Sequence, residues 1–488
     1  IDYHLNAHGD SHFSDFTVNS ETGNMALGAQ SVLAGMDFDG DGQGEILFSI
    51  DETLGPGGPD PGHVGCYLYE IDTLTGDYNY VWSFISPDPG NSLPGMFYGD
   101  IDADSLSEIY FGVPPSGGNN DNTWGTYIFE QNEDGTFPTT QTLLLQYGFT
   151  VTDNFRPSGY AIGDVDSDGY NELVTLDRAL RRMSIDEPDD EDMTSLTTFS
   201  NEYLVGESIL GGGSIYNLDI VDFDDDGDME VWVNTWNGFS MSIFEADSVE
   251  VDSYHVAADF NALFPAGDPG SFRRNGFAFH DADGDGDLDA WFPMTNGKLY
   301  YLDNVLDTVD TAGLWMGQLD SLKASHFHQV LTYAYNGRNR GSDMGDIDGD
   351  GKMDIIANTG NGETVVRMEF QGGDPKEASS YEVTTIFESK GEPGDRYYPL
   401  DISESDLDGD GKLEVVLTNL YASNPDQSSL FVLDYSPVTF PSDGSGADMP
   451  NLAPNWSVAA INQKMDIAFD DSVTTHFTNR SVIGGMDM

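Results

Sequence analysis

DFDGDGQGE, residues 37–45, places carboxylates at its first, third, fifth and ninth positions and Gly42 at its sixth. The same pattern recurs six more times, and successive copies start 58 to 65 residues apart. The other copies are DIDADSLSE (100–108), DVDSDGYNE (164–172), DFDDDGDME (222–230), DADGDGDLD (281–289), DIDGDGKMD (346–354) and DLDGDGKLE (406–414). A repeat of this length is typical of proteins built from one supersecondary unit used many times.

These acidic loops do not fit the EF-hand pattern. An EF-hand needs a glutamate at the twelfth position and a helix on each side of the loop. The twelfth residues here are Phe48, Phe111, Thr175, Val233, Phe292, Ala357 and Leu417. Each loop leads instead into a short β-prone run, such as EILFSI (45–50) or EVWVN (230–234), which predicts a strand.

Further β-prone runs fill the rest of each repeat. VLAGM (32–36) precedes the first loop, and CYLYEID (66–72) and YVWSFI (80–85) follow its second strand. Four antiparallel strands per repeat, repeated radially, predict an all-β fold, a seven-bladed β-propeller in which closing the ring removes exposed sheet edges. A linear array of modules is disfavoured, because no Pro/Gly/Ser linker recurs at a constant position.

The ends of the chain suggest a division into three parts. Residues 1–25 are an N-terminal segment, 26–480 the propeller, and 481–488 either a closing strand or the start of a further repeat. SVIGGMDM (481–488) closely repeats SVLAGMDF (31–38). An eight-bladed disc would follow if the chain continued beyond Met488.

The composition of the loops predicts metal binding. All 28 residues at positions one, three, five and nine are acidic, whereas the seventh residue varies, as expected where the ligand is a backbone carbonyl. Hard oxygen donors without His or Cys favour calcium, with about seven sites. Ser105 replaces the glycine of the sixth position, which makes the second site the weakest. The predicted ligands are Asp37, Asp39, Asp41, Gln43, Glu45, Asp100, Asp102, Asp104, Leu106, Glu108, Asp164, Asp166, Asp168, Tyr170, Glu172, Asp222, Asp224, Asp226, Asp228, Glu230, Asp281, Asp283, Asp285, Asp287, Asp289, Asp346, Asp348, Asp350, Lys352, Asp354, Asp406, Asp408, Asp410, Lys412 and Glu414.

The simpler interpretation, that these are solvated acidic turns, is unfavourable electrostatically. Four carboxylates within roughly 4 to 6 Å repel one another and raise one another's pKa unless a cation compensates. Seven calcium ions would add 14 positive charges to a formal net charge of −68, leaving about −54.

On these motifs the chain resembles the FG-GAP/VCBS repeat family, the propeller type of integrin α subunits and of many secreted bacterial proteins. The acidic loops match that family's D-x-D-x-D-G-x-x-[DE] pattern, YFGVPP (110–115) resembles its FG and GAP signatures, and the resemblance extends from about residue 30 to 435. It implies that the calcium loops are structural and lie on one face of the disc, while partners bind the opposite face. One propeller scaffold serves many roles, so the resemblance is weak for function.

The face opposite the loops offers two candidate binding features. The long connections 51–63, 114–124 and 420–428 are rich in Gly and Pro. Either they recognise a partner, or they are insertions that the fold tolerates without a function. Arginines recur six to ten residues before several loops, where they could converge as an anion site for acidic sugars or a partner's carboxylates, or lock neighbouring blades together. These are Arg156, Arg273, Arg274, Arg338, Arg340 and Arg396, and Arg480 precedes the final segment in the same way.

Bulk composition narrows the classes of partner. With 86 acidic and 18 basic residues, the chain is predicted to bind neither nucleic acid nor anionic membrane, and no apolar stretch is long enough to span a bilayer. The single cysteine, Cys66, excludes an intramolecular disulfide framework and CxxC sites. A start at Ile1 without a hydrophobic leader suits a mature secreted protein or a trimmed chain.

Other segments carry less signal. The histidines of YHLNAHGDSH (3–12) are interpreted as part of a frayed tail, and IDEPDDEDM (185–193) as a solvated acidic loop. No GxSxG, HExxH or P-loop motif occurs.

We therefore expect a secreted, bacterial, calcium-stabilised and non-catalytic propeller that serves adhesion, ligand binding or surface assembly, with a protein or carbohydrate partner. One alternative is an extracellular polysaccharide lyase, in which the arginines would neutralise a uronate and Tyr397 or His280 would move a proton. Another is the structural subunit of an extracellular filament or coat.

Overall fold

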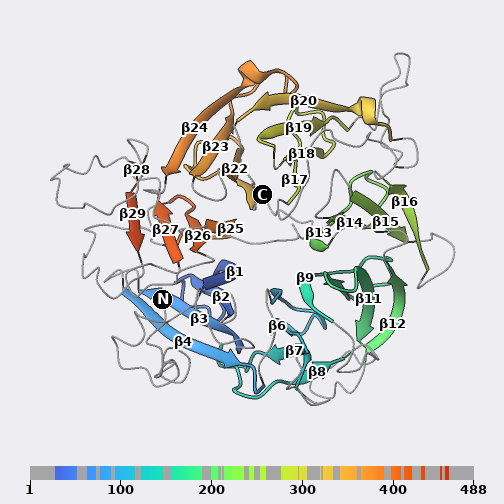
Figure 1. Cartoon of the computed structure of the whole chain (residues 1–488), viewed down its shortest axis with the longest axis vertical. Helices are drawn as coiled ribbons and strands as arrows, with labels where there is room; N and C mark the ends of the chain where they lie inside the picture. Colours follow the sequence, from blue (N-terminus) through green and yellow to red (C-terminus); the bar gives the residue numbers. More distant parts are fainter. Residues whose placement is uncertain are drawn as a thin grey trace.

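Seven β-sheets stand around a common centre in the computed structural model, as blades around a ring (Figure 1). The predicted all-β, seven-bladed propeller is thereby confirmed. The structure describes residues 28–51, 63–72, 77–88, 94–115, 123–146, 155–188, 199–206, 210, 214–235, 241–246, 253–259, 276–294, 296–304, 319, 322–333, 341–359, 364–388, 397–407, 411–419, 430–434, 451–452 and 457–460. The predicted segments 1–25 and 481–488 lie outside these ranges.

The first four blades each contain four antiparallel strands in sequence order. They are β1 (Gly28–Met36), β2 (Glu45–Asp51), β3 (Val64–Asp72) and β4 (Asp77–Ile85); β5 (Met96–Gly99), β6 (Glu108–Val113), β7 (Gly125–Glu130) and β8 (Leu143–Leu145); β9 (Pro157–Gly163), β10 (Glu172–Asp177), β11 (Arg182–Pro188) and β12 (Phe199–Val205); β13 (Ile215–Val221), β14 (Glu230–Thr235), β15 (Met241–Ala246) and β16 (Tyr254–Asp259).

The last three blades keep this plan, except that the sixth blade has an additional strand at the rim. They contain β17 (Ala278–His280), β18 (Asp289–Pro293), β19 (Lys298–Leu302) and β20 (Phe327–Thr332); β21 (Ser342–Gly345), β22 (Asp354–Thr359), β23 (Thr364–Phe370) and β24 (Tyr381–Glu388); β25 (Tyr397–Ile402), β26 (Val415–Asn419), β27 (Leu430–Asp434) and β29 (Ser457–Ala460). β28 (Asn451–Leu452) pairs with β24, so the sixth blade has five strands where four were expected.

Every acidic loop joins the first strand of its blade to the second, as the sequence predicted. EILFSI forms most of β2, and VLAGM forms the second half of β1. One prediction was wrong: residues 185–188 of the expected acidic loop belong to β11, where Asp186 is 2% exposed. Asn201 of the neighbouring strand donates a hydrogen bond of 2.8 Å to Asp186 Oδ1, and this bond gives the buried carboxyl a partner.

The second strands of the blades are the most deeply buried, and the rim is the most exposed part. First strands such as β1 and β9 lie nearest the centre, and fourth strands such as β4 and β12 form the rim (Figure 1). The second strands β6, β10 and β14 are buried at every position, because neighbouring blades cover both faces of the sheet. β12 is exposed or half-buried at six of its seven positions, in keeping with its place at the rim.

Large aromatic side chains fill the space between blades. Trp82 of the first blade packs against Phe129 of the second with ring centroids 4.9 Å apart, and its indole N–H bonds the carbonyl oxygen of Pro138 at 2.8 Å. Trp291 of the fifth blade donates to the hydroxyl of Tyr381 in the sixth, also at 2.8 Å. A buried aromatic residue thus contributes both apolar area and a satisfied polar group.

The ring closes by packing the seventh blade against the first. Ser405 Oγ bonds the carbonyl oxygen of Gly35 at 2.7 Å across this junction. Gly35 has φ +85°, and a Cβ there would lie 2.6 Å from the backbone nitrogen of Glu404. Only glycine allows both this conformation and this approach.

Candidate metal centres of the acidic loops

The loops are shaped by their own aspartates. In six loops the backbone N–H of the sixth residue donates to the first aspartate, at 2.5 to 3.1 Å. The sixth residue has positive φ in all seven, including Ser105 at +77°. The serine therefore adopts the glycine conformation, which costs an L-residue about 1–2 kcal/mol. The second loop keeps the common shape.

The ninth residue fastens each loop to the second strand. Its carboxylate accepts the backbone N–H of the second loop residue in all seven blades, at 2.5 to 3.1 Å. These acidic residues are Glu45, Glu108, Glu172, Glu230, Asp289, Asp354 and Glu414, and each is no more than 2% exposed. The repeat of this bond explains why a short acidic side chain stands at the ninth position in every copy.

In the second, third and fourth blades this bond leaves one carboxyl oxygen without a partner. The Oε1 atoms of Glu108, Glu172 and Glu230 are buried and receive no hydrogen bond. Burial, reinforced by the charges of nearby aspartates, raises the pKa of each of these glutamates to about 9. An orphaned, fully buried carboxyl oxygen is unfavourable unless a cation binds it.

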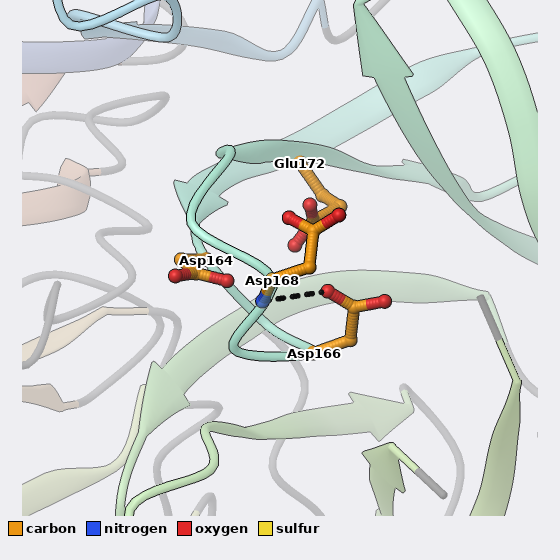
Figure 2. Close-up of side chains that lie close together, drawn as sticks. All are labelled: Asp164, Asp166, Asp168 and Glu172. Carbon is orange, nitrogen blue, oxygen red and sulfur yellow. Dashed lines mark hydrogen bonds between the residues drawn. The ribbon is translucent and has the colours of Figure 1, made fainter. Parts of the chain in front are cut away.

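The third blade shows how the carboxylates converge (Figure 2). Asp164, Asp166, Asp168 and Glu172 each offer an oxygen, and these four atoms lie within 4.8 Å of one another. The N–H of Asp168 bonds Asp166 Oδ1 at 3.3 Å, and this bond orders the loop. Four hard oxygen donors around one point fit a calcium ion, which takes six to eight oxygens.

Other loops repeat the arrangement. Asp222, Asp224, Asp226 and Glu230 form a second group of four, and Asp37, Asp39 and Asp41 and then Asp100, Asp102 and Asp104 form groups of three within the same limit. In the fourth blade burial raises the pKa of Asp224 to about 7, with Asp226 adding to the shift. In the seventh loop Asp406, Lys412 and Glu414 lie in the described part of the chain, and Asp408 and Asp410 do not.

The structure adds an acidic residue that the loop motif missed. The third strand places an acid beside the ninth loop residue: Glu45 pairs with Glu70, Glu108 with Glu130 and Asp354 with Glu369. Glu70 joins Asp39 and Glu45 in a group within 4.8 Å. Continuing the register by one residue gives Glu187, Glu245, Asp303 and Asp434 in the other blades. These acids are visible in the sequence, in runs such as CYLYEID (66–72) and TYIFEQ (126–131). Only the strand register shows that they lie beside the ninth loop residue.

The sixth loop differs from the others in its partners. Asp348 and Asp354 contact the guanidinium of Arg367, and Asp350 contacts Lys352. In the fifth loop Asp289 also accepts the backbone N–H of Asn304 at 2.9 Å. Asp354 and Asp289 are the two ninth residues that are aspartate rather than glutamate, and in both a protein donor reaches the second oxygen.

On the opposite face only Arg156 of the proposed arginine set is described. It precedes β9, and its backbone carbonyl accepts the N–H of Arg178, 3.1 Å away, in the turn between β10 and β11. Arg181 and Arg182 follow in this turn, and the Arg178 guanidinium lies 5.9 Å from the ring centre of Tyr216 in the fourth blade. Sequence reasoning missed this turn, because its arginines follow a loop rather than precede one. Arg273, Arg274, Arg338, Arg340 and Arg396 lie outside the described residues, as do most of the long connections and the tail histidines.

His280 stands apart from these arginines. It ends β17 immediately before the fifth loop and is therefore at the metal-loop end of its strand, whereas Arg156 is at the other end of β9. Burial lowers the pKa of His280, and its ring lies against Trp291 with centroids 6.5 Å apart. This position does not support the lyase alternative, in which His280 would act together with the arginines of the opposite face.

No protein-family model matches the chain, and no curated protein is significantly similar to it. Solved structures give distant similarities. A periplasmic gluconolactonase of Pseudomonas aeruginosa is 13% identical over 71% of this chain and 82% of its own, with a TM-score of 0.42. An Agrocybe aegerita lectin that recognises non-reducing terminal N-acetylglucosamine is 12% identical over 89% and 94%, with a TM-score of 0.45. A putative 6-phosphogluconolactonase of Bacteroides uniformis is 11% identical over 89% and 99%, with a TM-score of 0.38.

Similarities of this size say nothing about the activity of this chain. As for membranes, no helix in the described part of the chain is both long enough and apolar enough to cross a bilayer.

Proposed function

We propose that this chain is a calcium-stabilised propeller of the FG-GAP/VCBS type, and that it works outside the cell as a non-catalytic binding module. The observation that carries the metal part is the buried, unpartnered carboxyl oxygen of Glu108, Glu172 and Glu230. Glu172 and Glu230 each also belong to a group of four carboxylates with three aspartates of their loop. Hard oxygens of this number and flexibility select calcium over softer metals and over magnesium.

Calcium in these loops would act on the fold rather than on a substrate. Neighbouring loops contact one another: Asn171 of the third loop bonds the carbonyl oxygen of Asp100 at 3.2 Å, and Ser167 bonds that of Gly227 at 3.1 Å. An ion that fixes one loop therefore also fixes the junctions with the next blades. Folding and metal binding are then linked, as in other structural metal sites.

Metal content and thermal unfolding test this part. The purified chain should contain several calcium ions, and excess EGTA should lower its melting temperature in a way that calcium reverses. Asp166→Asn should remove one ion per chain, whereas the exposed Glu133→Gln should remove none. A chain without bound calcium whose melting is unchanged by EGTA would refute the proposal.

We place the binding function on the face opposite the loops, with an anionic protein or carbohydrate as partner. Arg156, Arg178, Arg181 and Arg182 gather at this end of the third blade, in a chain with 18 basic residues altogether. Guanidinium groups suit carboxylates, because they donate planar, paired hydrogen bonds. Extracellular or cell-surface location, bacterial origin and assembly into a larger structure belong to the same proposal.

Binding to an acidic polysaccharide such as polygalacturonate, measured by calorimetry, tests this part. We expect binding that weakens with salt and with Arg178→Ala, but not with Lys323→Ala, which removes a basic residue at the other end of a blade. Formation of unsaturated products would show a lyase instead, and failure of all acidic glycans and peptides to bind would remove the anion site. Electron microscopy of native material would detect a filament or coat.

A further inference from the structure

One third-strand position separates the sixth blade from the rest. It is the residue paired with the second residue after each loop. In five blades this residue is apolar, namely Leu68, Ile128, Ile185, Ile243 and Val432. In the fifth blade it is the uncharged Tyr301, whose hydroxyl donates to Asp303 Oδ1 at 3.2 Å. All six are no more than 1% exposed. In the sixth blade the position is Arg367, paired with Ile356.

The guanidinium of Arg367 lies among the loop carboxylates. Its Nε bonds Asp354 Oδ1 at 2.5 Å, and its Nη2 bonds Asp348 Oδ2 at 2.8 Å and Glu369 Oε2 at 3.0 Å. Asp348 and Asp354 are the third and ninth loop residues. Residues two apart on a strand point to the same side of the sheet, so Arg367 and Glu369 face the loop together.

The contrast with the other blades concerns the same atom. In the second, third and fourth blades the second oxygen of the ninth residue is buried without a partner. In the sixth blade that oxygen, Asp354 Oδ1, accepts from Arg367, whose side chain is 7% exposed. Lys352 adds a further cation, with Nζ 2.5 Å from Asp350 Oδ2 and 2.7 Å from Glu369 Oε1.

We propose that the sixth loop takes no calcium ion, and that the Arg367 guanidinium occupies the ion's place between Asp348 and Asp354. A calcium ion would need these same oxygens at about 2.3–2.6 Å. It would then stand beside a positive group held in a buried position, where like charges repel strongly. The sixth blade is thus fastened by a side chain of the protein, and its loop keeps its shape when calcium is removed.

This inference rests on the proposed function, because it presumes that the other loops bind calcium. Its test counts calcium ions per chain, by elemental analysis after dialysis, in wild type and three variants. Asp166→Asn in the third loop is the reference, and we expect it to lose one ion. Asp348→Asn removes the equivalent carboxylate of the sixth loop and should lose none. Arg367→Ile installs the residue of three other blades and should gain one.

The outcomes separate the two proposals. Absence of calcium from wild type, or no loss with Asp166→Asn, refutes calcium binding at the loops. If Asp166→Asn loses one ion and Asp348→Asn also loses one, the sixth loop binds calcium and the inference is wrong. A folded Arg367→Ile that gains no ion also overturns it, because the guanidinium would then not be what keeps calcium out. Should Arg367→Ile fail to fold, the comparison of Asp348→Asn with Asp166→Asn decides.

Discussion

Glu172→Gln should stabilise the fold without calcium and should reduce the stabilisation that calcium provides. Glu172 is fully buried, and its Oε2 accepts the N–H of Val165 at 2.5 Å while its Oε1 has no partner. Glutamine keeps the size and retains a carbonyl oxygen for Val165, but it removes the ionisable group. The variant therefore isolates the charge that a metal ion would neutralise.

Without calcium, the variant should be more stable than wild type. Burial raises the pKa of Glu172 from 4.5 to about 9, so the folded apo chain holds a proton at pH 7.5 that the unfolded chain releases. At about 1.36 kcal/mol per pKa unit, three units between 4.5 and 7.5 correspond to about 4 kcal/mol as an upper figure. Because glutamine removes this free-energy cost of protonation, the substitution should stabilise the apo fold by a substantial part of this ~4 kcal/mol.

With calcium, the advantage of the variant over wild type should shrink. A ligand at 100 times its dissociation constant stabilises the fold by about 2.7 kcal/mol per site. An amide oxygen replaces a carboxylate at a site with three aspartates, so the variant should lose much of this term. We expect calcium to stabilise wild type by about 1–3 kcal/mol more than it stabilises the variant.

Urea unfolding at pH 7.5, in EGTA and in millimolar calcium, measures both differences. Glu133→Gln makes the same chemical change at an exposed position and should alter neither curve. The reasoning fails if calcium stabilises Glu172→Gln as much as it stabilises wild type, or if the apo form of the variant is no more stable than apo wild type.

Three further predictions concern pH and backbone conformation. In EGTA, the melting temperature should fall as pH rises from 5 to 9. The buried glutamates have folded pKa values raised to about 8 or 9, so their contribution to stability is present below the unfolded pKa of 4.5 and is lost as pH rises through the folded pKa. The calcium-loaded chain should lack this decline, and equal slopes of melting temperature against pH in the two buffers would contradict the assignment. Gly35→Ala should destabilise the fold by about 2–4 kcal/mol, because it combines a positive φ with a Cβ 2.6 Å from the backbone nitrogen of Glu404. Gly206→Ala is the control, because Gly206 has open space around it. Equal losses of stability in the two variants would disprove the ring-closure argument. Ser105→Gly should stabilise the fold by about 0.5–1 kcal/mol, because glycine adopts the positive φ of 77° without strain. A lower melting temperature in calorimetry would show that the serine side chain contributes more to stability than its backbone strain costs.

Much of the candidate site could be predicted from sequence because its residues are local. The aspartates at the first, third and fifth positions and the acid at the ninth lie within nine residues, and the short loop brings them together almost regardless of the rest of the fold. The acids of the third strand were not predicted. Glu70 is 25 residues from Glu45, and only the pairing of β2 with β3 makes them neighbours.

Arg367 illustrates the same limit more sharply. In the sequence it is one basic residue in the strand TVVRMEF (364–370), 13 residues beyond Asp354. Its significance appears when the register of β22 and β23 turns its guanidinium towards the loop, at a position where the six other blades bury an uncharged side chain.

The sequence by itself determined the order of the strands and the place of each acidic loop, because period, alternation and turn residues are properties of neighbouring positions. It favoured seven blades but left eight open. Only the tertiary structure decided that the Arg367 guanidinium lies among the carboxylates of the sixth loop, how the seventh blade meets the first at Gly35, and which end of the disc holds His280. Those features depend on contacts between residues far apart in the chain, and strand register and blade packing set the distances over which charges and backbones meet.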